Sequence, residues 1–204
     1  MQQREVVLRF GQTGSGKTYS ANQKLRTLTR VLVGDCGFGE FDAQSFDTFP
    51  DCCLYLESIG AFENKSVPFR VAYTPKLGEH SVMFTLAKEL GYCHLFLEEG
   101  DMFGDPRQDP DYWDAIVRGR HWCLSLEFLG VNPYLCPIDV RRQSTEIISF
   151  RQTEPADISW LAQRVGDIAY ELPNLPGPGL DSSMRPPYPY LHWRAGRGGE
   201  IVRP

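Results

Sequence analysis

The chain has 204 residues, of which 42% are hydrophobic and 23% charged, and its formal net charge is −5 at pH 7. These values are typical of a folded globular protein with one α/β domain. An acidic protein does not coat nucleic acid with its whole surface, so any such contact must be local. No run approaches the roughly 18 apolar residues of a membrane helix. The N-terminal MQQREVVLRF lacks the apolar region of a signal peptide, so we expect a soluble intracellular protein.

Short apolar runs alternate along the chain with stretches of helical pattern. The strands expected from these runs are Val6–Phe10, Arg30–Val33, Phe69–Tyr73, Cys93–Glu98, Trp122–Phe128 and Glu146–Phe150. The helices expected between them are Gly16–Thr29, Gly78–Leu90, Asp111–Arg118 and Pro155–Gly166. Because the strands are apolar along their length, the pattern predicts an α/β fold with a mainly parallel sheet covered by helices on both faces.

The end of the chain differs in composition from the rest. Leu172–Pro189 is rich in Pro and Gly, which predicts an extended, irregular strap. Tyr188–Trp193 and Glu200–Val202 flank a glycine-rich turn and predict a terminal β-hairpin. Without the hairpin this tail would be disordered. We therefore expect a main domain over residues 1–170, with the strap and hairpin of residues 171–204 packed on it.

The segment GQTGSGKT lies between an expected strand and an expected helix. Its pattern, GxxxxGK[ST], is that of a phosphate-binding loop (P-loop or Walker A motif), in which glycines let backbone N–H groups converge on an anion. The N-terminus of the following helix adds partial positive charge. Lys17 is expected to reach the β- and γ-phosphates of ATP, and the Thr18 hydroxyl to bind Mg²⁺. The predicted nucleotide site comprises Gly11, Gln12, Thr13, Gly14, Ser15, Gly16, Lys17, Thr18 and Tyr19.

An acidic pair follows a later apolar strand. His94 to Leu97 is apolar in pattern and leads directly into Glu98 and Glu99. P-loop hydrolases need such carboxylates, one to hold Mg²⁺ and one to polarise the attacking water. We assign Glu98 to the metal and Glu99 to catalysis, with Asp101 as a rival to either. The alternative is a solvated acidic loop, since other acidic residues follow.

Together these motifs resemble the FtsK/HerA superfamily of DNA-pumping P-loop ATPases. In size the chain is most similar to the viral branch, the genome-packaging ATPases of membrane-containing icosahedral viruses. The resemblance covers about residues 4–166, and its most specific part is VRRQSTEIISFRQTEPADISWL. In that branch a strand reading roughly I-I-x-F-R precedes an acidic helix that starts after a proline. The segments Ile147–Arg151 and Pro155–Ile158 stand in those places.

The resemblance implies a RecA/FtsK-HerA-like P-loop NTPase fold and a site completed by a second subunit. Arg118 and Arg120, in the segment RGRH, match the region where the family places a trans-acting arginine finger. Such an arginine stabilises charge on the γ-phosphate of the neighbouring subunit, and the spacing favours Arg120. A basic helix end stabilised by the helix dipole is the alternative interpretation.

The chain departs from the family at the sensor strand. The family ends this strand in a Gln before Arg-Pro, whereas here Val131 falls at the glutamine's place and is followed by Asn132. Valine cannot position a water molecule. Either Asn132 replaces the glutamine, or this chain senses the nucleotide differently.

The function implied is that of an ATP-hydrolysing, Mg²⁺-dependent translocase that packages double-stranded viral DNA into a preformed capsid. Its implied partners are duplex DNA, further copies of itself in a hexameric or pentameric ring, and capsid vertex proteins. Its implied location is the host cytoplasm, the packaging vertex of the virion, or both. A small nucleoside or metabolite kinase, a related secretion or phage-assembly ATPase, and a nucleotide-binding protein without turnover are the alternatives.

Overall fold

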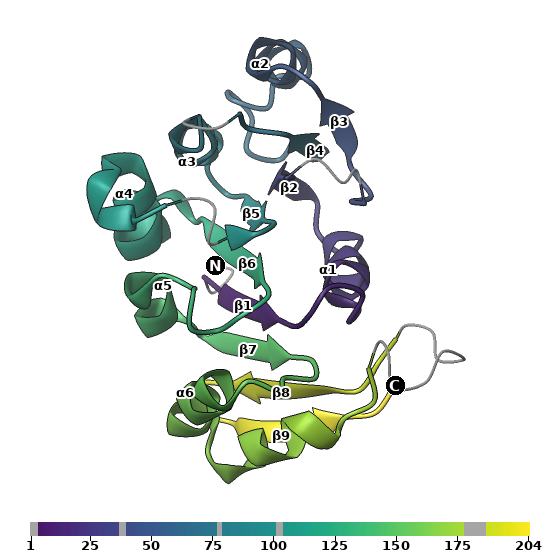
Figure 1. Ribbon diagram of the computed structural model, residues 1–204. Coiled ribbons are helices and arrows are strands. Elements are labelled where there is room, and N and C mark those ends of the chain that lie inside the picture. The colour runs from purple at the N-terminus through teal and green to yellow at the C-terminus, as the bar shows by residue number, and fades with distance from the viewer. Residues whose placement is uncertain (1–3, 37–39, 77–78, 101–103, 178–186) are drawn as a thin grey trace.

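A single mixed sheet organises the chain in the computed structural model, which describes residues 4–36, 40–76, 79–100, 104–177 and 187–204 (Figure 1). Its strand order is β3-β4-β2-β5-β6-β1-β7-β8-β9. The strands are β1 (Val6–Phe10), β2 (Arg30–Gly34), β3 (Gln44–Phe46), β4 (Phe69–Tyr73), β5 (His94–Leu97), β6 (Ser125–Gly130), β7 (Glu146–Ser149), β8 (Tyr190–Arg194) and β9 (Gly198–Val202).

Strands β1 to β7 pair in parallel, and the last two pair antiparallel. The carboxyl ends of the parallel strands therefore all lie at one edge of the sheet, which is the usual ligand-binding edge of α/β proteins. We call this the carboxyl edge and the opposite one the amino edge. Strand β1 lies between β6 and β7, so the loop after Phe10 begins on the carboxyl edge between the ends of these two strands.

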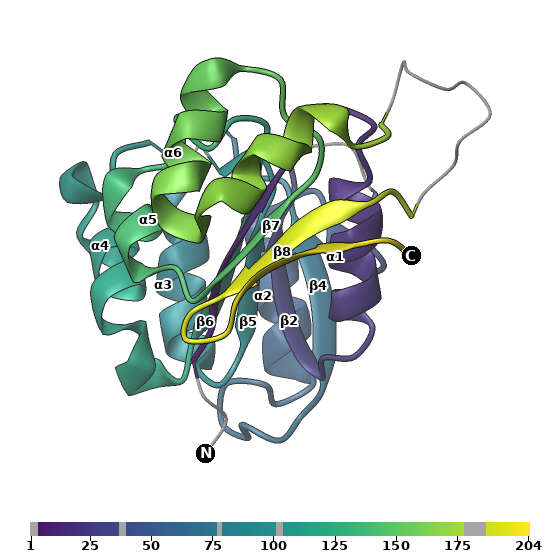
Figure 2. The same cartoon turned by 90° about the horizontal axis from the view of Figure 1, so that it is seen from below.

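Helices cover both faces of the sheet. They are α1 (Lys17–Leu25), α2 (Phe49–Ser58), α3 (Ser81–Leu90), α4 (Pro110–Arg118), α5 (Ile138–Gln143) and α6 (Pro155–Val165), with short 3₁₀ helices η2 (Pro106–Gln108), η3 (Gly119–Trp122) and η4 (Asp167–Asn174). Helix α1 packs on one face, whereas α3, α4, α5 and α6 lie on the other (Figures 1 and 2). The predicted fold class is confirmed.

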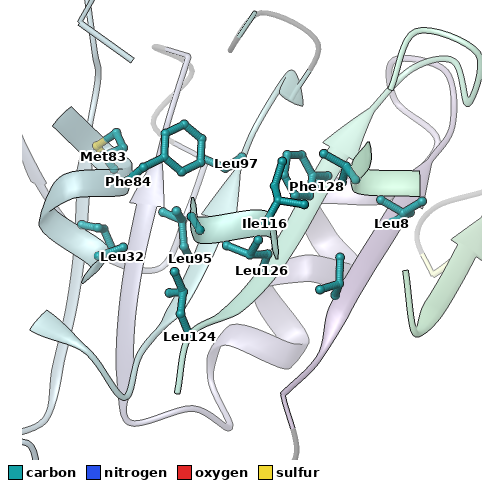
Figure 3. Packing of buried hydrophobic residues seen from close by; sticks show 14 of the residues in the cluster. Leu8, Leu32, Met83, Phe84, Leu95, Leu97, Ile116, Leu124, Leu126 and Phe128 are labelled. Atoms are coloured by element: carbon teal, nitrogen blue, oxygen red, sulfur yellow. The ribbon is translucent and has the colours of Figure 1, made fainter. Parts of the chain in front are cut away.

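Alternate side chains of the buried strands supply the cores on the two faces. Leu8, Leu95, Leu126 and Phe128 belong to the larger core under α3 and α4 (Figure 3). Their neighbours along the strands, such as Phe96 and Leu129, pack with Ala21 and Leu25 of α1 in a separate, smaller core. A strand buried on both faces is apolar at most positions, which is why the sequence showed nearly continuous apolar runs. Arg9 and Glu127 are buried exceptions.

A buried ionic cluster joins α1 to the sheet. Arg9 of β1 forms a salt bridge with Glu127 of β6, and both side chains are almost fully buried. Lys24 of α1 lies 3.2 Å from the same carboxylate, and Arg9 donates a 2.5 Å hydrogen bond to Ser20. Removing one partner of a buried pair typically costs about 3–5 kcal/mol. The helix that carries the phosphate loop is thus anchored by charge as well as by apolar packing.

Several boundaries differ from the sequence expectations. The stretch from Trp122 is not strand: residues 119–122 form η3, Cys123 adopts a positive φ of 53°, and β6 starts only at Ser125. Helix α2 and the short elements β3 and α5 were not predicted. The sequence did contain a start signal for α2, namely the N-cap residue Thr48, whose side chain accepts a 3.2 Å hydrogen bond from the Asp51 N–H.

The C-terminal strap was predicted only in part. The first residues of the predicted strap, 172–174, belong to the helix η4 and are not irregular, since Ala169 and Leu172 of this helix are buried against the core. The middle of the strap, residues 178–186, lies outside the described residues. The predicted hairpin is present as β8 and β9, and its first strand pairs with β7. The division into residues 1–170 and 171–204 stays a prediction.

Within the ranges described above, no helix is long and apolar enough to cross a membrane.

Candidate nucleotide site

A cleft of about 380 Å³ opens at the carboxyl edge of the sheet, beside the start of α1. Residues from the predicted phosphate loop and from the predicted acidic pair line the same cleft, although they lie far apart in sequence. The lining residues are Thr13, Gly14, Gly16, Lys17, Thr18, Tyr19, Glu40, Glu98, Glu99 and Leu129. The structure therefore brings together the two motifs that the sequence analysis assigned to one site.

The remaining loop residues, Gly11, Gln12 and Ser15, form the base of the loop. The Gly11 N–H donates to the Gly130 carbonyl at 3.2 Å, and the Ser15 N–H donates to the Gln12 carbonyl at 3.0 Å. A Cβ atom at Gly11 would lie 2.4 Å from the Ser15 Oγ and 2.9 Å from the Phe150 Cβ. Glycine at this position is therefore a steric requirement of the turn.

Two further glycines give the loop its curvature. Gly14 and Gly16 have φ values of 77° and 94°, a region that residues with a side chain rarely adopt. Gly16 is the N-cap of α1 and contributes no side-chain hydrogen bond, and no acidic residue lies in the first turn. The first N–H groups of α1 thus have no capping side chain and form the positive end of the helix dipole, as an anion site requires.

Lys17 folds back over the loop. Its ammonium group donates to the Gly11 carbonyl at 2.5 Å and to the Gln12 carbonyl at 3.3 Å. Burial lowers the pKa of Lys17, while Glu99, Glu98 and Glu40 oppose that shift. Among the described residues that line the cleft, Lys17 is the one cationic side chain, and Glu40, Glu98 and Glu99 supply the carboxylates.

Glu98 is buried next to a second carboxyl group. Only 6% of the residue is exposed, and its side chain is hydrogen-bonded to Asp35, which follows β2. Burial, together with this hydrogen bond and the charge of Asp35, raises the pKa of Glu98 to about 8. The Cys36 N–H donates to the Glu98 carboxyl group at 3.3 Å. The neutral form of the Glu98 carboxyl group is therefore favoured at this position. The sequence analysis missed Asp35, although it follows an apolar strand as Glu98 does.

The oxygen donors in the cleft fit Mg²⁺. The Thr18 hydroxyl and the Glu98 carboxyl group both line it, and hard oxygen ligands are those that Mg²⁺ prefers, usually with water and substrate phosphates. A divalent cation bound at this position would favour the ionised form of Glu98.

Glu99 differs from Glu98 in conformation and exposure. It has a positive φ of 48°, which is unusual for a residue with a side chain. It is half-buried and lines the cleft, whereas Glu98 is buried. Strained backbone of this kind is found at functional sites where the surrounding structure imposes it. Asp101, the predicted rival, lies outside the described residues.

The end of the sensor strand is held by a residue that the sequence analysis did not identify. Val131 follows β6, and its carbonyl accepts a 3.1 Å hydrogen bond from the side-chain amide of Gln152. Gln152 lies just beyond β7 and is 1% exposed. Its neighbour Thr153 accepts a 3.5 Å hydrogen bond from Gln12 of the phosphate loop. A glutamine is thus present beside the loop, but it comes from β7 rather than from β6.

Arg118 and Arg120 do not reach the cleft of their own chain. Both precede β6 and lie at the amino edge, opposite the phosphate loop. Arg118 is 64% exposed and forms a 3.4 Å ion pair with Asp114, and Arg120 is also exposed. Neither belongs to the described lining of the cleft.

A scan against protein-family models and a search of curated protein sequences found no match. Solved structures do match. The genome-packaging NTPase B204 of Sulfolobus turreted icosahedral virus 2, in complex with ATP-γS, has a TM-score of 0.71 at 17% identity, over 100% of this chain and 99% of that chain. B204 of Sulfolobus turreted icosahedral virus, described as a DNA-packaging ATPase, has a TM-score of 0.66 at 16% identity, with 100% and 99% covered. VirB4 of Thermoanaerobacter pseudethanolicus has a TM-score of 0.63 at 11% identity, over 97% of this chain and 88% of that chain. At these identities the likeness shows the fold, and it confirms the predicted α/β P-loop NTPase fold.

Proposed function

We propose that this protein hydrolyses ATP and uses the reaction to move double-stranded viral DNA into a preformed capsid. The observation that carries the ATPase part is the convergence of the phosphate loop with Glu98 and Glu99 in one cleft. DNA as the cargo is supported by the fold shared with the two B204 proteins, which are described as a genome-packaging NTPase and a DNA-packaging ATPase.

Each side chain in the cleft has a distinct role in this proposal. The loop N–H groups and the N-terminus of α1 hold the phosphates of ATP. Lys17 leaves the carbonyls of Gly11 and Gln12 and pairs with the β- and γ-phosphates. Thr18 and Glu98 would hold Mg²⁺, which when bound would neutralise charge on the phosphate oxygens. Glu99, the more accessible carboxylate, accepts a proton from the attacking water.

We further propose that a neighbouring subunit completes the site. Among the described lining residues, no arginine faces the cleft, yet charge that develops on the transferred phosphoryl group needs stabilisation. Arg120, or else Arg118, would supply it in trans within a hexameric or pentameric ring. The exposure of both side chains at the amino edge is compatible with contact to another copy.

The wider setting follows from the same proposal. A packaging motor would bind duplex DNA and the proteins of the capsid vertex, and would be found in the host cytoplasm, at the virion vertex, or both. The fold shared with VirB4 favours a related secretion or phage-assembly ATPase as the second candidate function. Stimulation of ATP hydrolysis by duplex DNA distinguishes a DNA translocase from an ATPase that acts on other cargo.

The test is a steady-state ATPase assay with and without duplex DNA. We expect DNA-stimulated hydrolysis that is lost in Lys17→Ala and in Glu99→Gln. Glu171→Gln serves as the matched control, because Glu171 is exposed and lies outside the cleft. A strictly monomeric protein that phosphorylates a small molecule would overturn the proposal in favour of a kinase.

A further inference from the structure

Arginines from distant parts of the chain meet at the amino edge of the sheet, opposite the nucleotide cleft. Arg4 precedes β1 and Arg120 lies in η3, just before β6. Arg194 ends β8, and Arg197 lies in the turn between β8 and β9. Figure 2 shows this turn at the same end of the sheet as the start of β1, with the C-terminus at the far end of the hairpin. We refer to these four residues as the basic edge.

Arg4 is the fixed centre of the basic edge. Its guanidinium donates to the carbonyls of Leu124 at 3.1 Å, Ala115 at 2.9 Å and Ile116 at 2.6 Å. A Cβ atom at Gly119 would lie 3.0 Å from its Nη2, so the glycine lets the chain before Arg120 approach closely. Burial and the neighbouring positive charge of Arg120 both lower the pKa of Arg4. Two cations are therefore held near each other.

The hairpin turn extends this charge across a shared hollow. Arg4, Arg194 and Arg197 line a cavity of about 200 Å³, together with Glu5, Thr145, Glu146 and Ala195. The two carboxylates there already have basic partners. Glu5 pairs with Lys24 at 2.9 Å, and Glu146 pairs with His192 at 2.7 Å and with Arg194 at 3.3 Å.

Three cations of the basic edge are left without acidic partners. Among the described residues, Arg4, Arg120 and Arg197 form no ion pair, which is also true of Arg30, Arg70, Arg141, Arg151, Arg164 and Arg203. Ion pairs are formed by Arg9, Arg26, Arg107, Arg118, Arg142 and Arg194. A protein of net charge −5 thus keeps uncompensated positive charge at one edge. Such charge raises the local concentration of a polyanion and costs stability when it has no partner.

We propose that the basic edge binds the sugar–phosphate backbone of duplex DNA. This inference rests on the proposed function, which names DNA as the cargo but does not say which surface holds it. Guanidinium groups bind phosphate oxygens through paired hydrogen bonds, and such contacts carry no base preference, as a motor that moves any sequence requires. The exposed turn at Ala195 to Gly198 has no large apolar side chain, so it lacks the apolar centre of a protein–protein interface.

The test measures the affinity for a fluorescent duplex as a function of salt, without nucleotide. For Arg194→Gln/Arg197→Gln we expect the slope of log K against log salt to fall by about 2, and the affinity to fall about 30-fold near 0.15 M monovalent salt. Arg197→Gln alone should lower the slope by about 1, and this variant disturbs no described ion pair.

Arg203→Gln is the matched control. Arg203 is exposed and follows the same hairpin, but it lies beside the opposite end of β8. The affinity of Arg203→Gln for the duplex, and the salt dependence of that affinity, should equal those of the unchanged protein. The melting temperature of each variant monitors folding. A loss of affinity is interpreted only for variants whose melting temperature equals that of the control.

The outcomes separate this inference from the proposed function. If the unchanged protein binds the duplex and Arg194→Gln/Arg197→Gln binds it equally well, the basic edge is not the DNA surface, and the proposed function stands. If the unchanged protein binds no duplex at any salt concentration, both are overturned. Arg120→Gln gives a further test. If Arg120 contacts DNA, this variant should have a smaller slope of log K against log salt without nucleotide. If Arg120 acts only as an arginine finger, the slope should stay unchanged.

Discussion

The side-chain amide of Gln152 donates a 3.1 Å hydrogen bond to the main-chain carbonyl of Val131. This bond joins the ends of β7 and β6 beside the phosphate loop, at the place where the sequence showed valine instead of a sensor glutamine. Since Gln152 is buried, its position is set by the fold. A contact to the backbone of Val131 does not depend on which side chain that residue carries.

We expect Gln152→Ala to lower kcat about five- to tenfold while ATP affinity changes little, because a lost buried hydrogen bond of about 1 kcal/mol loosens the loop after β6. Val131→Ala is the control, since it keeps the carbonyl that accepts the bond. Steady-state kinetics with nucleotide-binding measurements test this. Equal kcat values in Gln152→Ala and Val131→Ala would show that the bond has no part in turnover.

If the site is shared between subunits as proposed, mixing the Glu99→Gln and Arg120→Ala variants tests it. Glu99→Gln removes the base from a subunit's own cleft, and Arg120→Ala removes the arginine offered to its neighbour. In a mixed ring, some interfaces pair an intact Glu99 with an intact Arg120, so mixing two inactive variants should restore part of the ATPase activity. Arg120→Ala alone should keep nucleotide binding nearly intact. Activity that stays absent at every mixing ratio, while both variants still assemble, would contradict a trans-acting Arg120.

The base of the phosphate loop should not accept a single added methyl group. Gly11→Ala would place its Cβ 2.4 Å from the Ser15 Oγ and 2.9 Å from the Phe150 Cβ, so the loop must shift and nucleotide affinity should fall at least tenfold. Gly130→Ala is the matched control at the facing strand end, where the nearest atom is an ordinary 3.8 Å away. Calorimetric titration with a non-hydrolysable ATP analogue measures both. Unchanged affinity of Gly11→Ala for the ATP analogue would show that the loop accommodates a Cβ atom at this position.

His94 should make the fold sensitive to acid. Burial, despite the opposing charge of Glu127, lowers its pKa from 6.5 to about 3. Between these values the unfolded chain binds the proton and the folded chain does not, so stability is complete above pH 6.5 and is lost as the pH falls. From pH 7 to pH 5 this loss should be on the order of 2 kcal/mol.

Urea unfolding of His94→Phe at pH 7 and pH 5 tests the prediction, because phenylalanine fills similar space and does not titrate. The variant should lose less of its unfolding free energy over this interval than the unchanged protein. His121→Phe is the control, since His121 is exposed and its loss should leave the pH dependence as it was. The same pH dependence in all three proteins would show that His94 is not buried in its neutral form.

Local sequence was sufficient for the parts of the site that are contiguous. Gly14 and Gly16 are the residues that tolerate positive φ, and the apolar run before Glu98 specified a strand that ends at the cleft. Asp35, Glu40 and Gln152 could not be assigned in this way. Each is a polar residue in an irregular segment, and it is the pairing of β2, β5, β1 and β7 that carries those segments to one edge.

The sequence by itself determined the phosphate loop, the acidic pair and the mainly parallel sheet, because glycine conformations and unbroken apolar runs are local properties of the chain. Only the tertiary structure decided which distant groups meet. It placed Glu98 against Asp35, set Gln152 on Val131, and gathered Arg4, Arg120, Arg194 and Arg197 at the edge away from the cleft. These contacts between distant residues depend on strand order. Strand order follows from how all the elements pack together and is not encoded in any one segment.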